Sequence, residues 1–212
     1  MNHRRVPGIL STSLAILSLS LLSFITDSHL SARKRIRIED QSRLYLQGTS
    51  NVNSFTCDCE DRFEAQLIEA ESGNGYSRFR NAGLALRVKS LNCRNRKIDT
   101  DLQKALMADQ YPNIQVVLLD SWQTAKCADG SCYDWFDVQA NVMITIARVN
   151  SKEFIRAKAR MLGPNRFQLK GEKWLKMSAF GITPPEAMFG MIKVNDDISF
   201  HFDLVVTVDE HL

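Results

Sequence analysis

The clearest pattern in the chain is an alternation of apolar and polar residues near the C-terminus. Apolar side chains occupy every second position over residues 198–208, with mostly polar residues between them. The same alternation runs over residues 138–146. A period of two places the apolar side chains on one face of a β-strand and the polar ones on the other. Both segments therefore predict strands that each bury one face.

Shorter segments repeat this pattern, at residues 84–88, 155–161 and 167–169. Residues 114–119 are apolar at consecutive positions, so we expect a strand that is covered on both faces. Turn-forming sequences separate the strands: Asp129-Gly130, Gly163-Pro164-Asn165 and Asn195-Asp196-Asp197. Because tight turns join antiparallel neighbours, the fold class is all-β and mainly antiparallel.

Residues 98–110 depart from the strand pattern. Leu102, Ala105 and Leu106 have the spacing of one helix face, and Tyr111-Pro112 ends the segment because the residue before a proline avoids helical geometry. We expect one amphipathic helix. An all-β chain of this length closes its sheet into a barrel or packs two sheets together, and alternation alone favours neither.

The N-terminal segment predicts export. A basic start precedes residues 14–25, an apolar run with interspersed serines. This run is shorter than the roughly 20 apolar residues of a spanning helix and is typical of a secretory signal. We expect cleavage after Ser28, a basic extension at residues 29–42, and one β domain at residues 43–212 in the periplasm or outside the cell. The basic residues that follow the run, Arg33, Lys34, Arg35 and Arg37, favour the alternative of an uncleaved anchor.

Composition excludes several classes of function. The 212 residues are 44% hydrophobic and 24% charged, as in an ordinary globular domain, and the net charge of +3 is too small to indicate nucleic-acid binding. Nucleophile elbows, phosphate-binding glycine loops and zinc-protease motifs are absent from the sequence. We therefore expect no enzymatic activity, cofactor, metal ion or nucleic-acid partner. Arg156, Lys158 and Arg160 form a basic stripe, which fits a solvated face or a dock for anionic headgroups.

Cysteines form stable disulfides in an oxidising compartment, so the expected export bears on how the five cysteines of the chain are paired. Cys127 and Cys132 flank a turn sequence, which predicts a disulfide across a hairpin. Cys93 can bond to either Cys57 or Cys59, which leaves the other as a free thiol. A thiol redox pair or a metal site built from these three residues is the functional alternative.

A set of motifs near the C-terminus gives a family resemblance. Lys176, Met177, Phe180-Gly181-Ile182 and Pro184-Pro185 are followed by Gly190-Met191-Ile192-Lys193-Val194 and then by the final strand. Upstream are Gly48-Thr49-Ser50-Asn51-Val52, the 96–106 helix region and Tyr111-Pro112-Asn113-Ile114. In this order the motifs resemble those of the YceI-like family of polyisoprenoid-binding, lipocalin-like proteins, in a divergent branch.

The resemblance implies an exported, eight-stranded lipocalin-like barrel that sequesters or carries a polyisoprenoid-like lipid without making a covalent bond. The residues expected to line its tunnel are apolar: Val138, Val142, Ile144, Ile146, Phe180, Met188, Phe189, Met191, Phe200, Phe202 and Leu204. Contact with membranes would be transient, and the oligomeric state is open, with a homodimer as one candidate. The competing functions are a disulfide-stapled structural β domain with a filled core and a thiol redox protein.

Overall fold

The structure is a computed structural model that describes residues 30–123 and 132–209; the expected signal segment and the Asp129-Gly130 turn lie outside these ranges. The described part is built from strands, with one α-helix and two short 3-10 helices. Their bounds are β1 Leu30–Ile38, β2 Arg43–Ser50, β3 Ser54–Cys59, β4 Gln66–Gly73, β5 Tyr76–Arg80, β6 Gly83–Arg87, η1 Val88–Ser90, β7 Leu91–Asn92, α1 Arg96–Ala105, β8 Asn113–Gln123, β9 Phe136–Ile146, β10 Val149–Gly163, β11 Arg166–Lys176, η3 Ser178–Phe180, β12 Glu186–Ala187 and β13 Ile192–Asp209.

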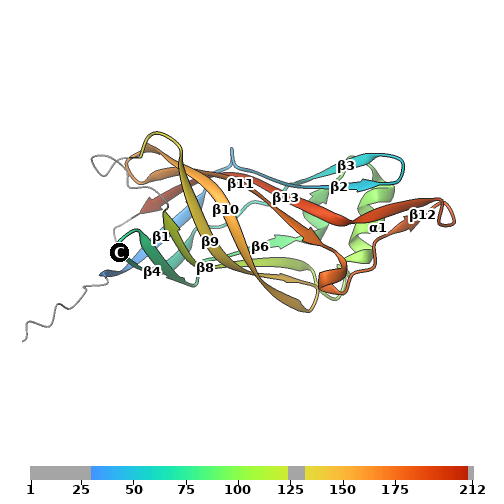
Figure 1. The fold of residues 1–212 in the computed structure, drawn as a ribbon, viewed down its shortest axis with the longest axis horizontal. Coiled ribbons are helices and arrows are strands. Elements are labelled where there is room, and N and C mark those ends of the chain that lie inside the picture. The colour runs from blue at the N-terminus through green and yellow to red at the C-terminus, as the bar shows by residue number, and fades with distance from the viewer. Residues whose placement is uncertain (1–29, 124–131, 210–212) are drawn as a thin grey trace, which may run out of the picture.

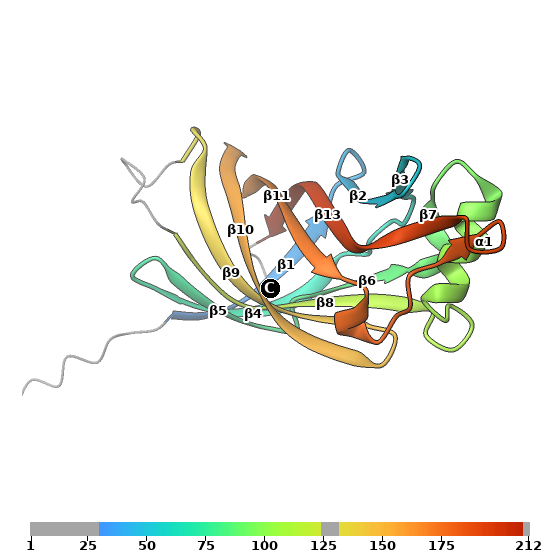
Figure 2. The same cartoon turned by 45° about the vertical axis from the view of Figure 1, so that its right-hand side comes forward.

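Within the described residues, eight strands form a closed antiparallel ring (Figures 1 and 2). Their order is β1, β4, β5, β8, β9, β10, β11 and β13, and β13 pairs with β1 to close the ring. Closure gives each of these strands a neighbour on both sides, which is how small all-β domains limit edge-to-edge association. The predicted barrel is therefore confirmed.

Two long strands each pair with two partners along one side. The first half of β13 pairs with β2 and its last residues pair with β1, while β8 pairs with β6 and then with β5. The strands β2, β3 and β7 extend the sheet at the end of the barrel where α1 lies (Figure 1). Among the described helices, none is long and apolar enough to span a membrane.

Strand β1 corrects the expected domain boundary. Residues 29–42 were expected to form a basic extension, but Ile36 pairs with Val208 and with Gln66, so β1 is a wall of the barrel. Its arginines Arg33, Arg35 and Arg37 are exposed, and Ile36 and Ile38 are half-buried. The alternation was obscured in the sequence because Lys34 occupies one of the inward positions.

The bend between β1 and β2 is held by Glu39 and Ser42. Arg166 donates two hydrogen bonds of 2.8 Å to the Glu39 carboxylate, and Thr207 donates a third of 2.6 Å. The Ser42 hydroxyl accepts from the Val205 amide at 2.9 Å, where the sheet ladder of β13 passes from one partner to the next. The Ser42 hydroxyl thus satisfies a backbone amide of β13 at the bend, and the bonds to Glu39 tie the bend to β11 and β13.

Helix α1 starts two residues before the predicted segment and ends five residues earlier. The side chain of Asn95 caps it by accepting from the amides of Lys97 and Ile98. Met107 adopts a positive φ of 51°, which stops the helix before the turn that precedes Pro112. Leu102 is buried in the barrel core, as the helical spacing predicted.

The expected turn at residues 195–197 is wrong. β13 continues through these residues, and its register with β2 shifts between Val194 and Ile198. Asp196 accepts hydrogen bonds from the amide and the hydroxyl of Ser178, so its carboxylate holds the neighbouring segment that begins at Ser178. The same polar residue types occur in β-bulges and in turns, so the sequence alone does not distinguish a bulge from a turn at this position.

The ladder between β10 and β11 is incomplete. Their pairing ends at Ala157 and Gly171, whereas β10 stays paired with β9 to Val149 and β11 stays paired with β13 to Lys176. The two strands thus continue past the last rung with the facing edge unpaired. We call this stretch, residues 149–156 and 172–176, the seam.

Candidate functional site

The apolar face predicted for residues 138–146 lies inside the ring. Val142, Ile144 and Ile146 are 4–5% exposed and belong to the packed core. Val138 lies on the same face of β9 because its sequence position differs from theirs by an even number. Its side chain is half-buried. These four residues therefore lie on the inner face of β9.

The C-terminal strand presents its predicted face to the same interior. Ile198 is buried in the core, and Phe200 packs against that core. Phe202 and Leu204 continue the inward row and are half-buried. Leu204 lies opposite Leu169, and Phe202 lies opposite Gly171 on β11.

The half of the barrel next to α1 is filled. Phe180 is 2% exposed and packs with Leu46 and Leu86, while Leu102 and Leu106 from the helix region complete the cluster. Ile144, Ile146 and Phe180, which were expected to line a tunnel, therefore lie in a packed core. The physical reason is that α1 and η3 occupy the volume that a through-tunnel would need at this end.

The other half of the barrel has an apolar inner wall that is not filled to the same degree. Eight of its inward side chains, from β1, β9, β11 and β13, are half-buried: Ile36, Ile38, Val138, Phe167, Leu169, Phe202, Leu204 and Val206. The inward side chains of Ile68, Ala70 and Ala159, on β4 and β10, are buried. Side chains of this type are normally fully buried when they face the interior of a domain. The partial exposure of the first eight leaves apolar surface that an apolar guest could cover.

Small residues widen this half. Ala157 lies opposite Gly171 on one side and Val138 on the other. Ala32 lies opposite Ala70 in the ladder between the neighbouring strands β1 and β4. Short side chains at facing positions leave the wall thin, which keeps the interior from closing by side-chain contact. Figure 2 shows the strands spreading apart at this end, away from α1.

The loop after Phe180 does not line the interior. Met188, Phe189 and Met191 are 57%, 107% and 63% exposed, and they form the tip of the β12–β13 hairpin. Met188 and Phe189 have positive φ values of 50° and 57°, and this backbone points the tip away from the barrel. The expectation that these three residues line a tunnel is therefore wrong. The apolar composition of a loop does not show whether a tight turn directs its side chains toward the protein or toward solvent.

One ion pair lies on the inner face beside the seam. Lys173 Nζ is 2.6 Å from Glu153 and 3.2 Å from the carbonyl oxygen of Phe154, so Lys173 joins β11 to the unpaired edge of β10. Ser151 donates to the same carboxylate at 2.6 Å. Burial alone would raise the pKa of Glu153, but the hydrogen bonds from Lys173 and Ser151 outweigh it and lower this pKa. The pair supplies a charged, internally satisfied group in an otherwise apolar wall.

Cys57 and Cys93 form a disulfide, which resolves the alternative left open by the sequence. Cys59 is a free thiol, and burial raises its pKa. A raised pKa leaves less thiolate at neutral pH, which disfavours a redox function for this residue. Cys132 is disulfide-bonded, and Cys127 lies outside the described residues.

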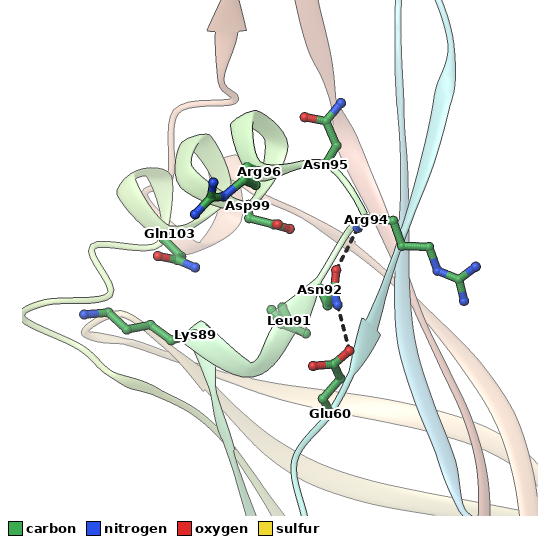
Figure 3. Close-up of a pocket in the computed structure, with 9 residues that line it drawn as sticks. All are labelled: Glu60, Lys89, Leu91, Asn92, Arg94, Asn95, Arg96, Asp99 and Gln103. Atoms are coloured by element: carbon green, nitrogen blue, oxygen red, sulfur yellow. Dashed lines mark hydrogen bonds between the residues drawn. The ribbon is translucent and has the colours of Figure 1, made fainter.

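A separate concavity of about 360 Å³ lies at the start of α1 (Figure 3). Leu91 is the one hydrocarbon side chain among its lining residues, and the polar groups bond to one another: Asn92 donates to Glu60 at 2.7 Å and accepts from the Arg94 amide at 2.8 Å. It does not suit an apolar ligand. Among residues 30–123 and 132–209, no three His, Cys, Asp or Glu side chains are grouped to hold a metal ion.

Comparison with solved structures places this barrel among known folds. A polyisoprenoid binding domain from Saccharophagus degradans, implicated in plant cell wall breakdown, aligns with a TM-score of 0.59 at 10% identity over 82% of this chain and 98% of that domain. The chain has a YceI-like, lipocalin-like barrel fold. BcnA of Burkholderia cenocepacia aligns with a TM-score of 0.52 at 14% identity, over 76% of this chain and 95% of BcnA. No family model and no curated protein matches the sequence.

Proposed function

We propose that this protein binds one long apolar lipid, of the polyisoprenoid type, in the half of the barrel distant from α1. The observation that carries the proposal is the inward row of half-buried apolar side chains that includes Phe202, Leu204 and Phe167. A protein of similar fold is a polyisoprenoid binding domain, which supports the same class of ligand.

Binding of this kind needs apolar area rather than directed polar contacts. Each methylene group of a ligand that leaves water contributes about 0.8 kcal/mol, so affinity should rise with chain length until the wall is covered. The lipid would be sequestered unchanged. Catalytic chemistry plays no part in the proposal, which treats the protein as a carrier and not as an enzyme.

Export fits this role. The N-terminal sequence favours a cleaved signal, and the Cys57–Cys93 disulfide is the kind of bond that persists in an oxidising compartment. Because β1 begins at Leu30, cleavage after Ser28 would leave every described strand intact. We propose a periplasmic or secreted location for the mature chain.

One observation favours a second candidate, a structural β domain. The core around Phe180 is fully packed and could stabilise the fold without any ligand. The two candidates differ in what they predict for the distant half: a carrier has a guest there, and a structural domain has water.

Equilibrium binding of polyprenols of increasing chain length tests the proposal. A carrier should bind a long polyprenol at least tenfold more tightly than a short one, because the longer chain covers more of the wall. A structural domain would bind neither, or both equally weakly at its surface, and this result would refute the proposal.

A further inference from the structure

The outer surface of β10 and β11 has an unusual charge distribution for a chain whose net charge is only +3. Its outward positions carry five exposed basic side chains and one exposed acidic side chain, Glu172. The basic ones are Lys152, Arg156, Lys158, Lys170 and Lys176. This surface, which we call the β10–β11 face, therefore carries more basic than acidic side chains on these two strands.

Part of this charge is neutralised by neighbouring strands and part is not. Lys158, Lys170 and Lys176 pair with aspartates of β9 and β13 at 3.1, 3.6 and 2.9 Å. For Lys152 and Arg156, no acidic partner lies within ion-pair distance in the described part of the chain. The unneutralised charge is thus concentrated on β10 next to the seam.

Large aromatic side chains lie among the basic residues of the β10–β11 face. Trp174 on β11 is 60% exposed and Phe154 on β10 is 38% exposed. Trp122 contacts Phe154 with ring centroids 5.8 Å apart, and the Arg156 guanidinium lies 5.5 Å from the centre of the Phe154 ring. Tryptophan together with lysine and arginine is the composition that suits the headgroup region of a bilayer.

We propose that the β10–β11 face docks on a lipid bilayer that carries anionic headgroups. Trp174 and Phe154 would enter the interface, and Lys152 and Arg156 would contact phosphate groups. The docked face contains the seam, where the Lys173–Glu153 pair bridges the unpaired strand edges. Docking would therefore bring the incomplete β10–β11 ladder against the membrane. The proposal does not depend on lipid binding inside the barrel.

The hairpin tip is the competing membrane contact. Phe189 and its neighbours are exposed and apolar, but Lys193 beside them is 3.3 Å from Glu186, which leaves this tip without net positive charge. Charge complementarity with an anionic surface favours the β10–β11 face over the tip.

Flotation with vesicles tests the proposal on the full-length gene product, purified from the soluble fraction of an exporting host. The wild type should bind vesicles of phosphatidylcholine mixed with phosphatidylglycerol, bind pure phosphatidylcholine at least tenfold more weakly, and lose binding as salt increases. Lys152→Glu combined with Arg156→Glu should reduce binding to the anionic vesicles at least tenfold. Trp174→Ser should reduce it several-fold and remove most of the blue shift in tryptophan emission.

The matched control places the same charge change on α1, as Lys97→Glu combined with Lys104→Glu, both of which are exposed. This control should bind as the wild type does. Equal losses in both double variants would mean that only net charge matters, and a loss confined to Phe189→Ser would assign the contact to the hairpin tip. Either result overturns the proposal, as does failure of the wild type to bind anionic vesicles or self-association through this face in sedimentation equilibrium.

Discussion

The ring of Phe202 lies across Gly171. A Cβ atom added at Gly171 would lie 2.6 Å from Cζ of Phe202 and 3.1 Å from the carbonyl oxygen of Arg156. Gly171 is opposite Phe202 in the β11–β13 ladder and opposite Ala157 in the β10–β11 ladder, at the last rung before the seam. The glycine therefore leaves room for the Phe202 ring on the inner wall.

Gly171→Ala should destabilise the protein by about 1–3 kcal/mol, since the new methyl group displaces the Phe202 ring and crowds the β10 backbone. Combining it with Phe202→Leu should recover part of the loss, because the smaller side chain vacates the contact. Urea unfolding of the two single variants and the double variant measures this coupling. Gly163→Ala is the control, because nothing lies within 4 Å of the added atom, and it should be near neutral.

Two inward residues should respond differently to truncation because one half of the barrel is filled and the other is not. Ile144→Ala should cost about 2–5 kcal/mol, as for a buried core residue. Leu204→Ala should cost about 1–2 kcal/mol in the ligand-free protein, because part of the side chain already contacts water. Denaturation of delipidated protein compares them. Equal, large losses would show that the interior is packed along its whole length.

Acid should weaken the bend between β1 and β2. Hydrogen bonds from Arg166 and Thr207 lower the pKa of Glu39 from its usual 4.5 to about 2. A carboxyl group whose pKa is lower in the folded state stabilises the fold above its unfolded pKa, and this contribution is lost as the pH falls from about 4.5 to about 2. The melting temperature of the wild type should fall over this range, and Glu39→Gln should show a smaller fall. Parallel curves for the two proteins would contradict this.

The cysteines divide into a structural bond and a thiol with low reactivity. Replacing both Cys57 and Cys93 by alanine should cost about 3–4 kcal/mol, as the chain-entropy estimate gives for a sequence separation of 36 residues. Cys59→Ser, the control, should leave this bond intact. Peptide mapping without reduction should also recover Cys127 linked to Cys132; recovery of free Cys127 from exported protein would contradict that part of the sequence prediction.

The alternating segments were enough to predict which side chains of a strand face the interior, whereas the barrel was implied by the family resemblance. Residues such as Val142 and Ile198 lie where a period of two places them, because inward and outward positions of a strand cannot exchange without exposing the whole apolar row. β1 was missed because Lys34 interrupts its inward row. In the structure the long side chain of Lys34 is only partly buried. The local sequence pattern does not predict that a lysine occupies an inward position of a strand in this way.

The extent of the interior could not be predicted. Ile144 and Leu204 give the same alternating signal, yet one is packed by α1 and η3 and the other is half-exposed, and this depends on contacts between distant segments. Phe189 likewise has the composition of a core residue, and only the left-handed backbone of its turn places it in solvent.

Lipid binding inside the barrel is tested most directly by native mass spectrometry of freshly purified protein. The measurement compares the wild type with Ala157→Phe. Ala157 is on the inner wall opposite Gly171, so a phenylalanine there would fill the space assigned to the lipid. Ala85→Phe adds the same ring at an exposed position of β6 and is the matched control. Lipid binding inside the barrel predicts a lipid-sized adduct on the wild type and on Ala85→Phe, and its loss from a folded Ala157→Phe protein. Wild-type protein without any adduct, even after incubation with a long polyprenol, would contradict it.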